Sequence, residues 1–151
     1  MKKKIIEKFI FEGFGFSVLL HNVVVGQYDG EDFPEINYKE LKDKTVRALI
    51  MSSKAISGAQ LQFLRKYMNK SLRDLGEELE VSHAQIKNWE DRSSELTGLS
   101  QNQERKLKNH ALNFIISQEQ QFLSDRLLTQ KIEYILDLGP FDPYKEELQY
   151  G

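Results

Sequence analysis

The side chains best suited to a chemical task lie together in one short segment, residues 82–88. Amide side chains can form paired hydrogen bonds with adenine, an ammonium group can reach guanine or phosphate, and a small apolar side chain can touch the methyl group of thymine. The segment contains all of these types. Its candidate DNA-binding residues are Ser82, His83, Ala84, Gln85, Lys87 and Asn88. This pattern predicts the recognition of base edges in double-stranded DNA.

Catalysis and metal binding have much weaker support in the sequence. The chain has no cysteine, so it has neither a thiolate nucleophile nor a disulfide. Its three histidines are isolated from one another and do not have the spacing of metal ligands. The acidic residues between positions 29 and 35 lack the glycine and the terminal glutamate of a calcium loop, so an acidic surface loop is the better interpretation. We therefore expect no catalytic residue, no bound metal and no cofactor. Hydrolytic or nucleolytic activity is the least favoured alternative.

Two short helices joined by a tight bend are predicted to position the polar segment. Apolar or small residues recur at the three-and-four spacing of a helix face, at Leu72, Leu75, Gly76, Leu79, Ile86 and Trp89. Ser71 and Ser82 can each cap a helix start, with Asp74 and Gln85 three residues later. A glycine inside a helix is costly, so Gly76 suggests that a neighbouring helix passes close by. An ordinary helical hairpin with a polar outer face is the alternative.

Residues 57–90 resemble a Cro/lambda-repressor-type helix-turn-helix domain of the XRE family. GAQLQFLRKYM corresponds to its first helix, SLRDLGEEL to its second and SHAQIKNWE to its recognition helix. The resemblance implies a transcription regulator whose recognition helix enters the major groove. Two positions depart from the family pattern. Glu80 stands where a glycine usually adopts a left-handed bend, and Leu72 stands where many members have a glutamine that touches phosphate.

The charge of the chain is too low for strong non-specific attraction to DNA. The formal net charge is -2, and residues 65–108 carry nine Lys or Arg against eight Asp or Glu. Weakly charged modules bind DNA poorly as monomers, so we expect a homodimer on two half-sites. The candidates for contacts with the DNA backbone are Arg65, Lys70 and Arg73, with Arg105 and Lys108 as further possibilities. Solvated surface is the alternative for these cations.

The N-terminal part of the chain is predicted to form an antiparallel meander of three or four short strands. Residues 7–36 are rich in Phe and Val and are interrupted at Gly13, at His21–Asn22 and at Asp29–Gly30. The runs VLL and VVV are continuous rather than alternating, so part of the sheet should be covered on both faces. The cover is expected to be either a helix over residues 37–52 or a partner protein.

A second resemblance covers this part of the chain. The run FGFSVLLHNVVVGQYDGEDFPEIN, followed by a helix and SGAQLQFLRKY, is similar to bacterial antitoxins of the MqsA/YgiT type. In that family a small zinc-binding β domain precedes a helix-turn-helix. Gly26 and Asp29 stand here in place of a cysteine pair, so no zinc is expected. The resemblance implies an antitoxin-like repressor of its own operon, with a cognate toxin as a candidate partner. The alternative is a protein-interaction module with a vestigial helix-turn-helix.

Taken together, the patterns predict an α+β fold with a small N-terminal antiparallel β-meander followed by an all-α helix-turn-helix domain with C-terminal helices. The expected division is 1–52 for the β-meander plus helix, 56–110 for the helix-turn-helix, and 111–151 for a C-terminal helix and an acidic tail. Apolar residues between 112 and 138 fit either a dimer interface or an intrachain core. No run has the length of a membrane span or the core of a signal peptide, so a cytoplasmic protein is expected.

Overall fold

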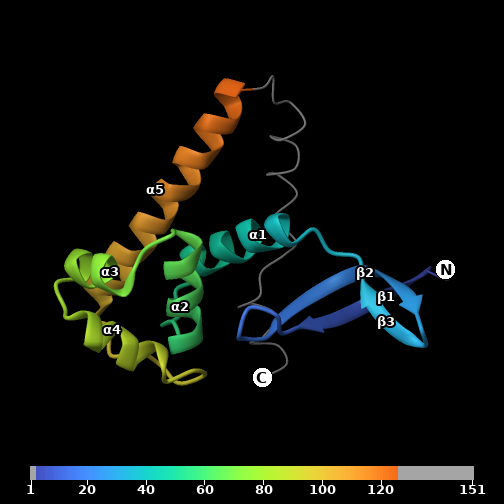
Figure 1. Ribbon diagram of the computed structural model, residues 1–151, viewed down its shortest axis with the longest axis horizontal. Helices are drawn as coiled ribbons and strands as arrows, with labels where there is room; N and C mark the ends of the chain where they lie inside the picture. Colours follow the sequence, from blue (N-terminus) through green and yellow to red (C-terminus); the bar gives the residue numbers. More distant parts are fainter. Residues whose placement is uncertain (1–2, 126–151) are drawn as a thin grey trace.

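The computed structural model describes residues 3–125 of the chain and confirms the α+β fold class (Figure 1). A three-stranded sheet comes first, and the helices follow it along the chain. The elements are β1 (Lys3–Phe11), β2 (Val18–Tyr28), β3 (Glu31–Pro34), α1 (Tyr38–Met51), α2 (Gly58–Tyr67), α3 (Leu72–Leu79), α4 (His83–Glu90) and α5 (Gln101–Asp125).

The sheet is an antiparallel meander in the order β1-β2-β3. Tyr28 pairs with Glu31, which leaves Asp29 and Gly30 as a two-residue turn. Both turn residues have positive φ, 50° at Asp29 and 80° at Gly30. This backbone is that of a type I′ turn, whose twist matches the twist of the flanking strands. The predicted hairpin turn at this position is therefore confirmed.

The turn predicted at His21–Asn22 is wrong, because β2 runs through these residues without a break. His21 pairs with Lys8 and Val23 pairs with Ile6, so the ladder with β1 continues on both sides of Asn22. Asn22 itself has φ 55°. Asparagine tolerates this left-handed conformation better than most residues, and here it serves inside a strand rather than in a turn. The meander consequently has three strands.

Two groups of buried side chains form the interior, and α1 belongs to both. The smaller core lies between the sheet and α1, and it consists of Phe11, Val18, Leu20, Val23, Val25 and Leu41. The larger core lies among the helices and includes Val46 and Leu49 of α1. Leu41 thus covers one face of the sheet, as predicted for a helix over 37–52. The predicted cover on both faces is wrong, because Ile5, Val24 and Phe33 on the other face are exposed. The boundary predicted after residue 52 does not separate the two cores, because one continuous helix contributes to each.

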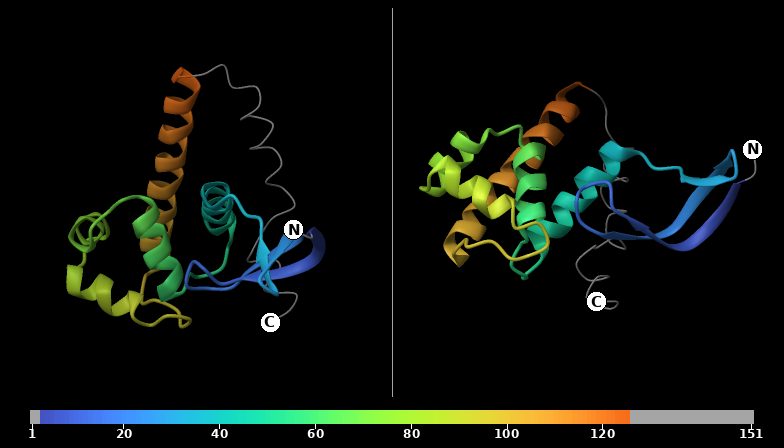
Figure 2. Two further views of the ribbon diagram at one scale, coloured as in Figure 1. Left: turned by 45° about the vertical axis from the view of Figure 1, so that its right-hand side comes forward. Right: turned by 60° about the horizontal axis from the view of Figure 1, so that its bottom comes forward.

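The loop between β1 and β2 also joins the sheet to the helices. The ring of Phe14 lies 4.8 Å from the ring of Phe63 on α2, and the ring of Phe16 lies 5.3 Å from it. Figure 2 shows this loop lying against α2. The aromatic contacts stabilise the orientation of the sheet because each ring buries apolar area against the same helix.

The N-terminal half of α5 is fixed to the other helices by its side chains. Glu104 accepts a hydrogen bond from the backbone N–H of Ile56 at 2.8 Å, and Leu107, Ala111 and Ile115 are buried. The remainder of α5 extends away from the small helices (Figure 1). The predicted apolar positions from 126 to 138 and the acidic tail lie outside the described residues. Within residues 3–125, no helix is long and apolar enough to cross a membrane.

Candidate nucleic-acid interface

Helices α3 and α4 form the predicted pair, and each is capped at its start by the predicted serine. Ser71 Oγ accepts a hydrogen bond from the backbone N–H of Asp74 at 3.0 Å, and Ser82 Oγ accepts one from that of Gln85 at 3.1 Å. The bend passes directly over Gly76, where an added Cβ would lie 2.7 Å from the carbonyl oxygen of Val81. Gly76 therefore makes room for the bend that leads into α4, rather than for a neighbouring helix.

Glu80 ends α3 in the left-handed conformation, with φ 60° and ψ 41°. Glu80 therefore has the left-handed backbone that the family resemblance implies for this position. A residue with a Cβ pays about 1–2 kcal/mol for this conformation, whereas glycine adopts it freely.

Replacing Glu80 with glycine is expected to raise the free energy of unfolding by up to about 1 kcal/mol. The relief of strain exceeds the extra backbone entropy that glycine gives to the unfolded chain, which is about 0.5–1 kcal/mol. Urea denaturation measures the difference. Glu77→Gly is the control, because Glu77 is an exposed residue inside α3. The control should be less stable by about 1 kcal/mol. Destabilisation by Glu80→Gly would contradict the left-handed bend.

The apolar side chains of helix α4 pack into the core, and its polar side faces solvent. Ile86 is fully buried, and Trp89 is buried with its indole ring against Gly98. Gln85 is half-buried beside the cap. The other predicted base-reading and cap residues are all exposed, and they are Ser82, His83, Ala84, Lys87 and Asn88.

Arg65 was predicted to contact phosphate, but its guanidinium group forms hydrogen bonds within the protein. Nε lies 2.6 Å from Oε2 of Glu90, Nη2 lies 3.0 Å from Oε1 of Glu90, and Nη1 donates to the carbonyl oxygen of Lys70 at 3.0 Å. The side chains of Arg65 and Glu90 are only 12% and 1% exposed. This two-pronged ion pair ties α2 to the C-terminal end of α4. Arg65 therefore positions α4, and its guanidinium group is occupied within the protein rather than free for the predicted phosphate contact.

Two further residues that were predicted to contact the DNA backbone also have partners within the protein. The ammonium group of Lys70 pairs with the carboxylate of Glu78, and that of Lys108 donates to the carbonyl oxygen of Ser52 at 2.7 Å. Arg73 and Arg105 are exposed, so they stay available for phosphate. Sequence spacing could not separate these cases, because the acceptors of Lys108 and Arg65 lie far away along the chain.

Lys87 is the cation at the centre of the exposed surface of α4. Its ammonium group lies 2.8 Å from Oδ1 of Asp91, one turn later on the same helix. The hydrogen bond to Asp91, together with the negative charge of that carboxylate, raises the pKa of Lys87. The group therefore stays protonated at neutral pH. Because both partners are well exposed, this pair is weak, and Lys87 can exchange Asp91 for a base or a phosphate at small cost.

The segment that carries the two helices is acidic rather than basic. Residues 71–92 contain three cations, Arg73, Lys87 and Arg92, against six carboxylates, Asp74, Glu77, Glu78, Glu80, Glu90 and Asp91. The internal pairs with Lys70 and Arg65 neutralise Glu78 and Glu90. Four carboxylates then remain against three cations, so the net charge of this segment does not attract a polyanion.

Two of the acidic residues near β3 form ion pairs with lysines of β1. Lys4 pairs with Asp32 at 3.2 Å, and Lys3 pairs with Glu35 at 2.8 Å. The hydrogen bond from Gln27, followed by that from Lys4, lowers the pKa of Asp32. Among residues 3–125, no three His, Asp or Glu side chains come together as a set of metal ligands.

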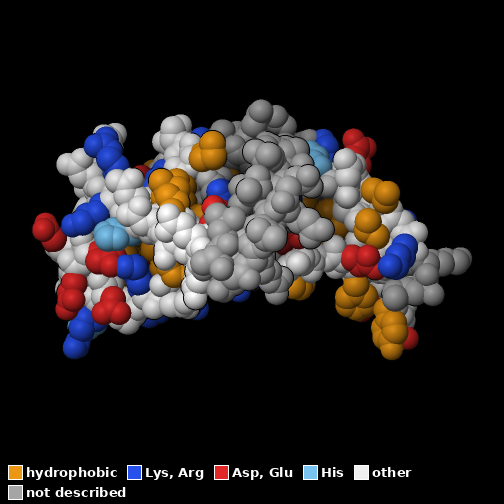
Figure 3. Space-filling view, turned by 90° about the horizontal axis from the view of Figure 1, so that it is seen from above, with side chains coloured by type: hydrophobic (Ala, Val, Ile, Leu, Met, Phe, Trp, Pro, Cys, Tyr) orange, Lys and Arg blue, Asp and Glu red, His pale blue; other side chains and the backbone are white. Residues whose placement is uncertain are grey.

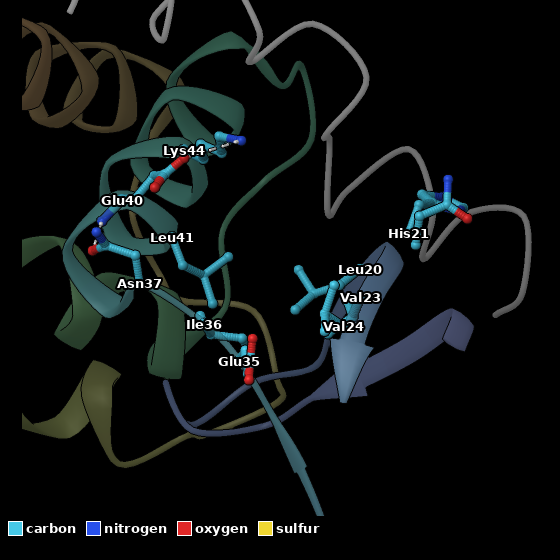
Figure 4. A pocket seen from close by; sticks show the side chains of 11 residues that line it. Leu20, His21, Val23, Val24, Glu35, Ile36, Asn37, Glu40, Leu41 and Lys44 are labelled. Carbon is cyan, nitrogen blue, oxygen red and sulfur yellow. Dashed lines mark hydrogen bonds and ion pairs between the residues drawn. The ribbon is translucent and has the colours of Figure 1, made fainter. Parts of the chain in front are cut away.

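A groove of about 540 Å³ lies between the sheet and α1, and the sequence did not indicate it. Figure 4 shows Leu41 pointing from α1 toward Leu20 and Val23 of β2, with Glu40 and Lys44 on the helix above. Glu40 and Lys44 pair with each other at 3.9 Å. The groove combines segments that are distant in sequence, so no local pattern could predict it.

Comparison with known proteins identified no relative: no protein-family model, no curated protein and no solved structure matches the chain. The surface of α4 must therefore be interpreted from its own side chains. The arrangement combines a short helix anchored from one side, an open N-terminal end, and amide, imidazole and ammonium groups directed to solvent. Such a surface can donate and accept several hydrogen bonds at once.

Proposed function

We propose that this protein is a sequence-specific DNA-binding regulator that reads the major groove with α4. The observation that carries the proposal is the division of α4 into two sides. Ile86 and Trp89 lie in the core, while Lys87 and Asn88 face solvent beside the exposed N-terminal residues of the helix. A major groove about 12 Å wide accepts one helix, and the N-terminal residues of that helix meet the base edges.

The side chains suggest a division of tasks within the complex. Asn88 and Gln85 are suited to adenine, Lys87 to guanine or phosphate, and Ala84 to a thymine methyl group. His83 and Ser82 lie at the start of α4, where exposed backbone N–H groups and the helix dipole favour a phosphate. Arg73 on α3 supplies a further backbone contact. These roles follow from residue type and exposure.

A homodimer provides the affinity that a weakly charged monomer lacks. Leu112 and Ile116 lie four residues apart on α5 and are 40% and 42% exposed, so they form an apolar stripe that a second copy can cover. Two copies would place two α4 helices on successive half-sites. Occupation of its own promoter would then make the protein a repressor, with antitoxin activity against a cognate toxin as the more specific version of this proposal.

Replacing Asn88 with alanine is expected to weaken binding to the preferred DNA sequence by about 1–3 kcal/mol, the value of a bidentate base contact. Binding to random DNA should change far less. The preferred sequence is first selected from a random duplex pool with the wild-type protein, and dissociation constants are then measured by fluorescence anisotropy. Asn109→Ala, at an exposed position on α5, is the matched control. Equal losses on selected and random DNA would argue against base reading by Asn88.

A second candidate function is favoured by one observation, the apolar outer face of the sheet. Ile5 pairs with Val24 across β1 and β2, and Phe33 lies beside Gly26 on the same face. Ile5 is 70% exposed and Phe33 is 49% exposed, and Figure 3 shows hydrophobic side chains gathered at this end of the molecule. Exposed apolar patches of this kind serve as docking sites for proteins. If the selection recovers no preferred DNA sequence, a protein-interaction module becomes the better proposal.

A further inference from the structure

A second groove, with a volume of about 420 Å³, lies where α1, α2 and α5 meet the loop between β1 and β2. Helix α2 contributes Phe63, Lys66 and Tyr67 to the groove. Arg65, the residue before Lys66 on α2, forms the ion pair with Glu90 that holds α4. The groove is therefore a separate feature from the proposed DNA-reading surface.

Aromatic rings form the walls of this groove. Phe14 of the hairpin loop packs on Phe63 at 4.8 Å, and Tyr67 packs edge-on against Phe114 of α5 at 5.3 Å. The hydroxyl group of Tyr67 donates to Oδ1 of Asp43 at 2.7 Å, which fixes the ring. Burial, with this hydrogen bond as the second cause, raises the pKa of Tyr67, so the phenol stays neutral. The rings offer a preformed apolar surface to a planar ligand.

Three lysines surround the aromatic walls with positive charge. Lys39 and Lys42 come from the first turns of α1, Lys66 comes from the last turn of α2, and all three are exposed. None of them forms an ion pair with another described residue. The groove has one carboxylate, Asp43, and that group already accepts from Tyr67. The positive charge of the rim is therefore largely uncompensated within the described part of the chain.

We propose that this groove binds a small aromatic anion, meaning one planar ring that carries a carboxylate or a phosphate. The ring would pack against Phe63 and Phe114, while the anionic group would lie between Lys42 and Lys66. Binding pockets for small molecules have volumes of about 300–1,000 Å³, with apolar walls and a few polar groups that orient the ligand. The groove has this size, and its four aromatic rings lie beside the three lysines, Asp43 and three amide side chains, those of Gln62, Asn69 and Gln118. The proposal does not depend on the DNA-binding function.

The test is an NMR titration of the isotope-labelled full-length protein with phenyl phosphate. We expect saturable shifts of the amide signals of Lys42, Lys66 and Phe114, with a dissociation constant of about 1 mM or lower. Inorganic phosphate, which lacks the aromatic ring, and benzyl alcohol, which lacks the anionic group, should each bind at least about tenfold more weakly than phenyl phosphate. Phenylacetate, in a parallel titration, distinguishes a carboxylate ligand from a phosphate ligand. Equal binding of inorganic phosphate, or no saturation by phenyl phosphate and phenylacetate at about 10 mM, would overturn the proposal.

Charge-reversed variants test the location of the site. Lys42→Glu combined with Lys66→Glu should weaken phenyl phosphate binding at least about tenfold, because two attractive charges become repulsive. Lys54→Glu combined with Lys106→Glu is the matched control, since both residues are exposed and neither lines the groove. The control should bind like the wild type. An equal loss in the control, or shifts confined to α4, would show that the anion binds elsewhere and would overturn the proposal.

Discussion

Replacing Glu90 with alanine is expected to lower the free energy of unfolding by about 3–5 kcal/mol, because it leaves the guanidinium group of Arg65 without its partner in a buried place. The carboxylate of Glu90 is 1% exposed and receives two hydrogen bonds from Arg65. The change also releases the C-terminal end of α4 from α2. Chemical denaturation followed by circular dichroism measures the loss, and the proposed DNA binding should fall with it.

Two further variants make this experiment specific for the buried pair. Asp91→Ala removes a carboxylate from an exposed pair with Lys87, next in sequence to Glu90, and should cost no more than about 1 kcal/mol. Arg65→Met combined with Glu90→Leu removes both charges and keeps apolar volume, so it should recover most of the stability that Glu90→Ala loses. A loss below about 1 kcal/mol for Glu90→Ala would show that water reaches the pair.

Replacing Ile86 with alanine is the second change with a large expected effect, a loss of about 2–5 kcal/mol in the free energy of unfolding. Ile86 is fully buried in the larger core. Removal of its outer carbons leaves a cavity that the short helices can close only in part. Denaturant titration gives the value, and the outward residues of α4 should lose their fixed position at the same time.

The control for Ile86 is another apolar residue that lies at the surface. Leu96 is 59% exposed, so Leu96→Ala should change stability by no more than about 0.5 kcal/mol. If Ile86→Ala and Leu96→Ala cost the same, α4 would not be anchored through its apolar side. That result would remove the physical basis of the proposed recognition surface.

The short helices could be predicted from sequence because their signals are local. Ser71 and Ser82 lie three residues before the amides that they cap, and Asp29–Gly30 contains the turn chemistry within two residues. The orientation of Ile86 followed from helical spacing in the same way. The exposed set on α4 was predictable as well, apart from the half-buried Gln85, since the apolar side fixes the polar side.

The features that sequence reasoning missed depend on partners that are distant along the chain. Arg65 looks like a surface cation until Glu90, 25 residues later, is brought against it. Lys108 finds the carbonyl oxygen of Ser52, 56 residues earlier. Asn22 misled the prediction for a different reason, because its left-handed backbone is compatible with a turn and with the interior of β2. Local pattern cannot choose between these outcomes.

Helix α1 places Leu41 in one core and Val46 and Leu49 in the other. Neither the sheet nor the helical core can unfold without exposing apolar side chains that the other one covers. Heating should therefore produce one cooperative transition rather than two separate ones. A change that destabilises the sheet should therefore also lower the temperature at which α4 unfolds, because both are lost in the same transition.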